Sequence, residues 1–367
     1  MRSNQTKVIL DSGAFTVWTK GTQINLDEYI SFCQKHPWIS YYVNLDVIPG
    51  SYGVVAKPDE IWKSCEQGWD NYQRMAKKLP KEKIIPVFHQ GDDSIWLKKM
   101  LDFGCDYVGI SPANDRTTSQ KLNWMRGTVK PIVLDKENKP IVGMHGFAVT
   151  SLRLMKEWQW KSVDSASWVR IGGMGSILLP KRKSGRFDYS TNPLLISVTE
   201  RGGDVQEGGF FADLMPGYGG TNHYTRLPNT MKGVFDLYLK ENEIGLGKWE
   251  ICDVGSSYKL NKRKERWYNK KKGLVFRVLK QGIATSHICR KWLNAKYYIE
   301  LPNHVPVEDL YLAGTVGNTC FRIESMIRNK LFSYHFLINS GENRRIFDYY
   351  KERVKSENQS TEFVGQT

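Results

Sequence analysis

The sequence lacks the features that mark secreted, membrane-spanning and dinucleotide-binding proteins. Its six cysteines, at positions 33, 65, 105, 252, 289 and 320, form no Cys-x-x-Cys pair, which argues against a disulfide framework and a compact zinc site. No uncharged apolar run reaches the roughly eighteen residues that a membrane span needs, and no apolar signal region precedes the first expected strand. No glycine-rich dinucleotide fingerprint occurs. We therefore expect a cytoplasmic protein.

The composition is that of a folded protein with excess positive charge. With 367 residues, 40% apolar and 25% charged, the chain can hold a barrel of about 250 residues or two ordinary domains. The formal net charge is +15, and it is unevenly placed: residues 1–175 carry 23 basic and 18 acidic side chains, whereas the remainder carries 30 and 20. The second half therefore supplies most of the excess.

The basic side chains of the second half gather in two clusters. A charge run is most often a solvated face, but here Trp267 and Tyr268 interrupt the larger cluster. Aromatic rings among cations suit stacking on exposed bases together with phosphate pairing, so the pattern favours nucleic acid as a partner. The candidate nucleic-acid-binding residues are Lys181, Arg182, Lys183 and Arg186, and Lys262, Arg263, Lys264, Arg266, Trp267, Tyr268, Lys270, Lys271 and Lys272.

Strand and helix signals alternate through the first half of the chain. Repeated strand-helix units predict parallel strands with right-handed crossovers. Polar residues end nearly every expected strand, which favours a (β/α)8 TIM-like barrel over an open doubly wound sheet, whose site gathers at one switch point. The expected strands are 7–11, 41–46, 83–90, 107–111, 140–145 and 161–164, and the expected helices include 26–35, one that opens at Pro58, 94–103 and 151–158.

The pattern changes after Arg170. Glycine pairs and clusters punctuate about fifty residues with little periodicity, which predicts an elaborated loop region. We divide the chain into residues 1–170, the first part of the barrel with the site motifs, and residues 171–367, a basic elaboration with the remaining barrel elements. Strand-like residues 273–279 and a helical stretch over 309–336 are the candidates for those last elements.

Two segments far apart in the sequence place an aspartate where an apolar run gives way to small residues. Asp11 stands in residues 8–15, and Asp164 stands in residues 162–168. Side chains at the carboxyl ends of parallel strands converge on one mouth, so two such carboxylates can flank one bond. One can attack while the other moves a proton. The two segments therefore predict paired-carboxylate chemistry.

Three further segments make this pattern specific. Residues 41–49, 84–91 and 107–112 are apolar runs that each end in a polar residue before a turn signal. In that order and with those endings, the five segments resemble the tRNA-guanine transglycosylase superfamily over roughly residues 7–170. The Asp-Ser-Ala-Ser of residues 164–167 is most similar to the archaeal branch. Because the accessory parts of the tRNA enzymes are missing, the chain looks most like the phage and bacterial enzymes that put 7-deazaguanines into DNA.

The resemblance implies a role for each of the two carboxylates. Asp164 matches the nucleophile that attacks the anomeric carbon of the sugar. A carboxylate suits this task because the transition state has oxocarbenium character and a covalent ester holds the sugar while bases exchange. Asp11 matches the acid/base residue that shuttles a proton between the bases. Plainer interpretations are a cap at Asp164 and an Asx turn of Asp11 with Ser12 and Gly13.

The resemblance also implies a pocket for guanine. Asp46 would accept hydrogen bonds from the ring N–H and amino group, while the Gln90 amide and the Gly109 backbone N–H would serve the other edge. Phe15 and His145 fall at stacking positions, although Phe15 would equally suit the core and histidine departs from the usual methionine or phenylalanine. The substrate-binding candidates are Ser12, Phe15, Asp46, Gln90, Gly109 and His145.

Two departures from the tRNA enzymes bear on the substrate. Bacterial and eukaryotic forms carry a Cys-x-Cys-x-x-Cys zinc site with a later histidine, and the scattered cysteines here do not match that spacing. No metal or other cofactor is therefore expected, and the second substrate is a free 7-deazaguanine base. Archaeal forms add C-terminal RNA-binding domains, for which the residues after Arg170 leave no room.

These departures favour DNA over tRNA as the substrate. The expected function is a DNA-guanine transglycosylase that exchanges guanine for a 7-deazaguanine, with 7-cyano-7-deazaguanine as the expected base, in the host cytoplasm if the protein is phage-encoded. One alternative is a tRNA-guanine transglycosylase of unusual form. The other is a DNA-binding protein that kept the barrel and lost catalysis.

Overall fold

The computed structural model describes residues 6–21, 23–51, 53–199, 222–253, 265–269, 274–314 and 335–339, with positions 352 and 355. The chain divides into two compact units: Met1–Ala166 with Leu301–Thr367, and Ser167–Glu300. The first unit is therefore assembled from both ends of the chain. Within the residues described, no helix is both long and apolar enough to cross a membrane.

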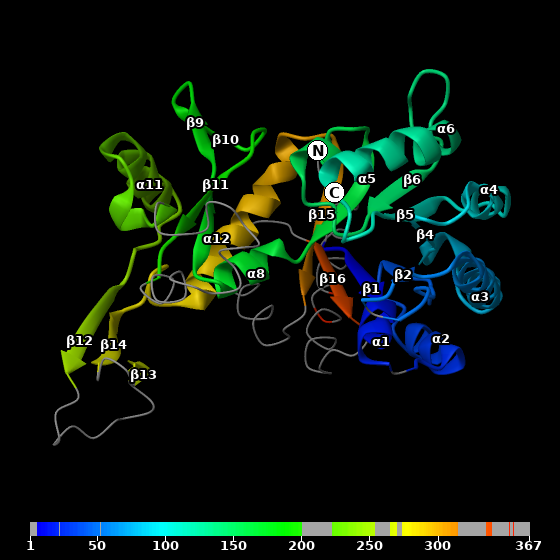
Figure 1. Ribbon diagram of the computed structural model, residues 1–367, viewed down its shortest axis with the longest axis horizontal. Helices are drawn as coiled ribbons and strands as arrows, with labels where there is room; N and C mark the ends of the chain where they lie inside the picture. The colour runs from blue at the N-terminus through cyan, green and yellow to red at the C-terminus, as the bar shows by residue number, and fades with distance from the viewer. Residues whose placement is uncertain are drawn as a thin grey trace, which may run out of the picture. The chain divides into compact units, whose positions relative to one another are not determined.

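The first unit is built on one parallel sheet with helices packed outside it (Figure 1). Among the residues described, its nine strands follow the order β3-β2-β1-β16-β15-β7-β6-β5-β4, with parallel pairing throughout. The two edge segments, β3 and β4, are separated only by Pro86. The strands are β1 Val8–Asp11, β2 Tyr41–Val43, β3 Ile84–Ile85, β4 Val87–His89, β5 Tyr107–Ser111, β6 Gly143–Gly146, β7 Trp160–Ser165, β15 Val307–Gly314 and β16 His335–Asn339.

Capping side chains mark the starts of some helices of this unit. Asn25 caps one of them by accepting from the backbone N–H groups of Asp27 and Glu28. Asp93 caps another by accepting from Ile95 N–H. The helices are α1 Ala14–Lys20, α2 Leu26–Lys35, α3 Pro58–Ala76, α4 Ser94–Asp102, α5 Thr118–Trp124, α6 Lys130–Val133 and α7 Leu152–Met155, with 3-10 turns at Lys81–Lys83 and Leu301–Asn303 and a π-helical turn at Met125–Val129.

The hydrophobic core cluster of the first unit is formed by strand side chains that face the same side of the sheet. Side chains alternate along a strand, so every second residue faces the same side of the sheet. The core side chains are Ile9, Val43, Ile85, Val87, Tyr107, Tyr311 and Ala313. Continuing the alternation by two residues from Ile9 reaches Asp11, and from Val87 it reaches His89. The polar groups of the candidate site thus stand on the core-facing side of the strand ends.

The second unit combines short antiparallel strands with two long helices. Strands β8 Ser176–Leu179 and β11 Leu194–Ser197 pair with each other, as do β9 Lys181–Lys183 and β10 Arg186–Asp188. The expectation of a loop region after Arg170 is therefore wrong for residues 176–197. The other elements are α8 Ser167–Gly173, a 3-10 turn at Tyr224–Arg226, α11 Asn229–Glu241, α12 His287–Glu300, and the three-stranded sheet of β12 Lys248–Asp253, β14 Leu274–Lys280 and β13 Glu265–Asn269.

The expected α/β class with parallel strands is confirmed, whereas the late elements need correction. A helix was expected over residues 309–336, but residues 309–314 belong to β15 and residues 335–336 to β16. Residues 315–334 lie outside the described part. The expected strand at 273–279 exists as β14, but it pairs antiparallel with β12 and β13 in the second unit and adds nothing to the parallel sheet.

Candidate active site

Three carboxylates converge where the strands of the parallel sheet have their carboxyl ends. Asp11 is the last residue of β1, Asp164 the next to last of β7, and Asp46 follows β2 by three residues. Burial, followed by the negative charges of Asp46 and Asp164, raises the pKa of Asp11 from its ordinary 3.8 to about 7, and the backbone N–H groups of Gly13 and Ser12 offset only part of this rise. The structure thus brings together the three aspartates that the sequence singled out.

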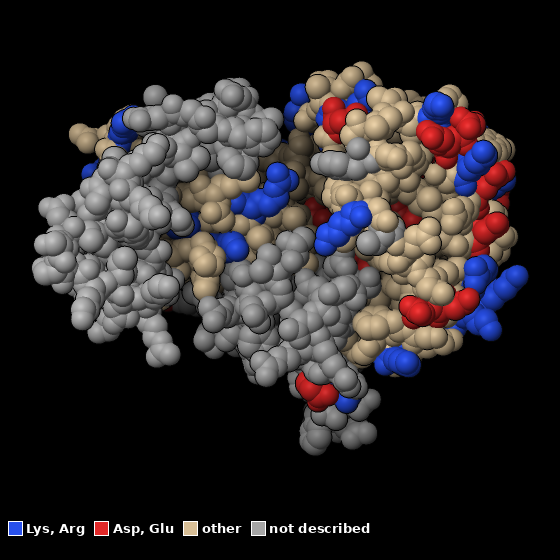
Figure 2. All heavy atoms as spheres, turned by 60° about the horizontal axis from the view of Figure 1, so that its bottom comes forward, with Lys and Arg blue, Asp and Glu red and all other residues tan. Residues whose placement is uncertain are grey.

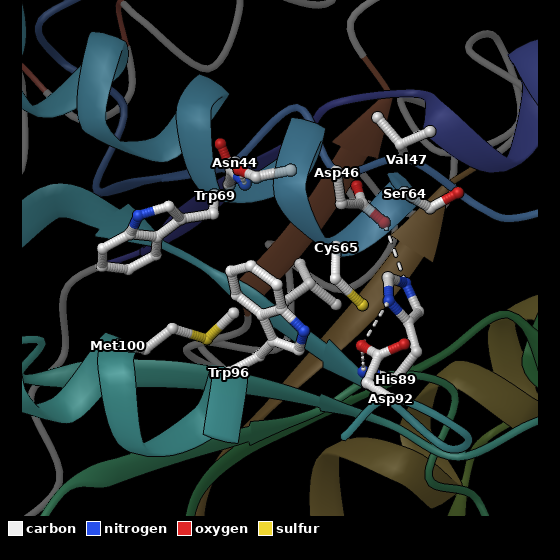
Figure 3. A pocket seen from close by; sticks show the side chains of 12 residues that line it. Asn44, Asp46, Val47, Ser64, Cys65, Trp69, His89, Asp92, Trp96 and Met100 are labelled. Carbon is white, nitrogen blue, oxygen red and sulfur yellow. Dashed lines mark hydrogen bonds and ion pairs between the residues drawn. The ribbon is translucent and has the colours of Figure 1, made fainter. Parts of the chain in front are cut away.

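Asp46 is held by two donors, one on each oxygen. Ser12 Oγ donates to Asp46 Oδ1 at 3.1 Å, and His89 Nε2 lies 2.9 Å from Asp46 Oδ2. The other ring nitrogen, His89 Nδ1, lies 3.5 Å from Asp92 Oδ2 (Figure 3). Burial opposes the charge on His89, but the hydrogen bonds and charges of Asp46 and Asp92 prevail and raise its pKa to about 10. At neutral pH a histidine cation therefore sits between two carboxylates.

Sequence reasoning missed this role of His89. The resemblance gave a recognition role to Gln90, and His89, the preceding residue on the opposite side of the strand, was not among the candidates. The structure shows His89 in the ion pair with Asp46. Gln90 is instead tied to the segment after β5 and to α5, because its Oε1 accepts from Ala113 N–H at 3.1 Å and its Nε2 donates to the Gln120 carbonyl at 3.5 Å.

Asp164 is oriented through one of its two oxygens. The backbone N–H of Ala148 donates to Asp164 Oδ1 at 2.7 Å, and His145 Nε2 lies 3.5 Å from the same oxygen. Ala148 has a φ of 51°, a left-handed conformation that costs a residue with a side chain about 1 kcal/mol. Strained backbone of this kind persists where surrounding structure demands it, often at functional sites. Among the described residues, no group donates to Asp164 Oδ2.

The expected stacking role of His145 is contradicted by its burial. Its side chain is 0% exposed, and its ring stands edge-on to Phe147, Tyr107 and Tyr311 at centroid distances of 4.4, 6.3 and 6.0 Å. No open face of this ring is left for a base. Phe15, the other stacking candidate, is 51% exposed at the start of α1, so it is not a core residue.

The expected donor role of Gly109 is also contradicted. Its backbone N–H already donates to the Pro86 carbonyl at 2.7 Å between the strands. A Cβ at this position would lie only 2.4 Å from the Phe147 ring. The glycine is therefore explained by the packing of Phe147, and Phe147 in turn contacts His145.

The pocket beside this edge is small and lies toward helices α3 and α4. Figure 3 shows His89 pointing toward Asp46 and Asp92, with the Cys65 sulfur nearby. Burial and the neighbouring Asp92 raise the pKa of the Cys65 thiol, which keeps it protonated. The cavity of about 20 Å³ has room for a water molecule but not for a purine base. A base would therefore have to approach the carboxylates from elsewhere.

Only part of the basic clusters can be placed. Lys181, Lys183 and Arg186 are exposed on the β9–β10 hairpin, where the register sets Lys183 opposite Arg186. Arg182 is exposed too, and its Nη2 donates to the Gly185 carbonyl. On the face drawn in Figure 2, described acidic and basic side chains lie interspersed along one rim. Of the larger cluster, Arg266, Trp267 and Tyr268 stand in β13, and their side chains, like Lys262, Arg263, Lys264, Lys270, Lys271 and Lys272, lie outside the described part.

Comparison with known proteins finds no match, so the residues of the site are the basis for a function. No known family, no curated protein and no solved structure matches the chain.

Proposed function

We propose that this protein is a DNA-guanine transglycosylase, which exchanges guanine in DNA for a 7-deazaguanine through a covalent aspartyl-sugar intermediate. The observation that carries the proposal is the convergence of Asp11, Asp46 and Asp164 at the carboxyl ends of parallel strands, where burial and the other two carboxylates raise the pKa of Asp11. Carboxylates in contrasting environments at one site are the usual means of dividing acid/base work from nucleophilic work.

We infer that the parallel sheet closes into an eight-stranded barrel. Its two edges are β3 and β4, and these are consecutive pieces of one extended segment interrupted at Pro86. Asn44 N–H donates to the Ile85 carbonyl on one side, and Gly109 N–H donates to the Pro86 carbonyl on the other. The segment therefore joins β2 to β5. Closure would place all strand ends around one mouth, as in TIM barrels.

The exchange divides into two balanced steps. In the first, Asp164 attacks C1′ of the nucleotide, the bond from C1′ to guanine N9 breaks, and Asp11 gives its proton to the departing base. In the second, the incoming 7-deazaguanine gives its N9 proton to Asp11 and attacks C1′, and the ester to Asp164 breaks. A carboxyl group with a pKa near 7 suits both transfers, because it can be acid and then base at neutral pH.

Base selection falls to Asp46 and Phe15. Each carboxylate oxygen of Asp46 accepts one donor in the structure, from Ser12 or His89. A carboxylate oxygen has a second lone pair, so each can still accept from the guanine ring N–H or amino group. The exposed Phe15 ring stands on α1, which follows Asp11 closely in the sequence, and it offers a face for the base.

The choice of DNA rests on the exposed basic hairpin and on a cysteine spacing that does not match the zinc site of the tRNA enzymes. Duplex DNA would require the target nucleotide to be extruded, at a cost of a few kcal/mol that phosphate contacts must offset. An unusual tRNA-guanine transglycosylase would use the same carboxylates. A non-catalytic DNA-binding barrel is less well supported, because such a protein has no physical need for Asp11, Asp46 and Asp164 together.

The test is base exchange followed by identification of the product. The protein is incubated with guanine-labelled DNA or tRNA and free 7-cyano-7-deazaguanine, and the nucleic acid is digested to nucleosides and analysed by mass. We expect loss of label and a 7-deazaguanosine product from DNA only. Asp164→Asn should abolish exchange while DNA binding persists, since only bonding in the transition state is lost. Appreciable turnover by that variant would remove Asp164 from the mechanism.

A further inference from the structure

A buried chain of polar groups leads from the core of the first unit to Asp164. Tyr107 Oη is hydrogen-bonded to Ser162 Oγ, and Ser162 Oγ is hydrogen-bonded to His145 Nδ1. The far nitrogen of the same ring, His145 Nε2, lies 3.5 Å from Asp164 Oδ1. Both His145 and Ser162 are 0% exposed, so water does not reach them.

The strand register builds this chain. His145 on β6 stands opposite Ser162 on β7, so their side chains are neighbours on the core-facing side. Asp164 follows Ser162 by two residues and faces the same way. His145 Nε2 has no hydrogen-bond partner among the described residues, and it lies 3.5 Å from Asp164 Oδ1. A buried donor or acceptor of this kind is costly unless it serves a neighbouring charge.

The hydrogen bonds in the chain can all run in one direction. Either oxygen of the Tyr107–Ser162 pair could be the donor, and burial keeps the Tyr107 pKa well above its ordinary value, so Tyr107 retains a proton that it can donate to Ser162. Ser162 can then donate its own proton to His145 Nδ1, which leaves the ring hydrogen on Nε2, facing the carboxylate. Neither Tyr107 nor Ser162 touches Asp164 in the hydrogen bonds of the structure. They act on it by fixing the tautomer of His145.

We propose that His145, oriented by Ser162 and Tyr107, is a positioning residue that holds negative charge on Asp164 Oδ1 and thereby presents Oδ2 as the attacking atom. The proposal rests on the proposed function, in which Asp164 is the nucleophile. Ala148 N–H donates to Oδ1 in the structure, and His145 Nε2 faces the same oxygen at 3.5 Å, from where it can serve as a second donor. These donors favour the carboxylate over its ester, so they assist the second step, in which the C1′–Oδ2 bond breaks and charge returns to Asp164.

The experiment separates the two steps. Enzyme and DNA are first incubated without free base, the covalent adduct is measured on a denaturing gel, and 7-cyano-7-deazaguanine is then added to discharge it. His145→Phe keeps a ring of similar size but has no donor. We expect it to form the adduct and to discharge it roughly tenfold to hundredfold more slowly, the range for loss of one hydrogen bond to a charged group. The adduct should therefore accumulate during turnover.

Two further variants test the chain. Ser162→Ala removes the donor to His145 Nδ1, so the ring proton can move to Nδ1 and Nε2 then faces Asp164 as an acceptor. We expect this variant to slow discharge of the adduct about as much as His145→Phe does, although Ser162 does not contact the carboxylate. His145→Gln, which retains an N–H donor, should restore part of the rate. The matched control is Ser176→Ala, which removes another fully buried hydroxyl, in the second unit, and should leave discharge unchanged.

The outcomes distinguish this proposal from the proposed function. If wild-type protein forms no adduct, or if Asp164→Asn exchanges bases normally, the proposed function falls and this inference falls with it. If the wild type forms an adduct but His145→Phe and Ser162→Ala discharge it at the wild-type rate, only the positioning role is overturned. Parallel loss of adduct formation and discharge, with a lowered Tm, would likewise overturn it, because that is the result of a purely structural role.

Discussion

At the scale of single residues, Asp11 shows how its neighbours set the chemistry of a carboxyl group. Burial is the largest cause of its raised pKa, and the charges of Asp46 and Asp164 add to it. The same residue type in an exposed turn would be ionised at neutral pH and unable to donate a proton. The raised pKa also affects folding, because the folded chain binds a proton that the unfolded chain has already lost.

We predict that Asp11→Asn removes a pH-dependent loss of stability. A pKa near 7 in the folded state and 3.8 in the unfolded state means that stability falls as the pH rises between these values. The variant should therefore match wild-type Tm at pH 4 and exceed it by a few degrees at pH 8. Thermal unfolding at both values checks this. A Tm difference that is the same at pH 4 and pH 8 would show that Asp11 titrates normally.

A second prediction separates proton transfer from base selection. Asp11→Asn should lower the rate at saturating base, because the proton donor is lost. Asp46→Ala should mainly raise the concentration of free base at which the rate is half-maximal. Each donor of the base that is left unpaired in the site weakens the binding free energy by roughly 1 to 3 kcal/mol. Initial rates over a range of base concentrations measure both effects. If both variants lose rate and affinity in equal proportion, the division of roles is wrong.

At the scale of elements, the β9–β10 hairpin offers a compact basic surface. Its two turn residues, Ser184 and Gly185, have φ values of 49° and 81°, which suit the twist of a two-residue hairpin turn. The register places Lys181, Lys183 and Arg186 on one face and Arg182 on the other. A two-stranded ribbon of this kind can follow the groove and backbone of a duplex.

We predict that the three cations on one face of the hairpin bind phosphates. Replacing Lys181, Lys183 and Arg186 by glutamine should weaken binding to all DNA sequences alike and flatten the log-log salt dependence by roughly 0.9 per lost contact. Arg182→Gln, on the opposite face, is the matched control and should change the slope little. Binding measured at several salt concentrations checks both variants. An unchanged slope in the triple variant would make this hairpin a solvated surface.

The helix expected over residues 309–336 shows where pattern reading fails at this scale. Residues 310–314 of β15 are apolar or small and buried. A short apolar run of this length fits a strand enclosed on both faces as well as a helix, and periodicity does not separate them. Pairing with β7 on one side and β16 on the other decides for the strand.

At the scale of the whole molecule, the first unit depends on the end of the chain. Strands β15 and β16 lie between β7 and β1 in the sheet, so the first 166 residues leave two strands without their partners. We predict that a chain ending at residue 300 will not fold cooperatively, because it exposes the edges of β1 and β7. Circular dichroism and thermal unfolding, compared with the full chain, measure this. A cooperative transition in the shortened chain would contradict the assembly from both ends.

The DNA hypothesis stays a prediction, and at this scale it concerns charge. The excess of basic residues falls in the second half of the sequence. Its densest run, residues 262–272, lies largely outside the described part, whereas the hairpin cluster is described. Long-range attraction of a nucleic acid depends on where such charges gather, and the sequence alone supplies their number.

The sequence by itself determined the local features of this protein. Strand ends that carry Asp11, Asp46 and Asp164 could be found because a polar residue after an apolar run is a signal carried by adjacent residues. Helix α2 was predicted at Leu26–Lys35 for the same reason, since its apolar stripe is a local pattern.

Only the tertiary structure decided which distant groups act together. The pairing of His89 with Asp46 joins β4 to the segment after β2, and the chain from Tyr107 through Ser162 to His145 joins β5, β7 and β6. The tertiary structure also showed that the missing side chain of Gly109 makes room for the Phe147 ring. Each of these depends on strand register and burial, which arise from pairing between segments far apart in the chain and leave no local signal in the sequence.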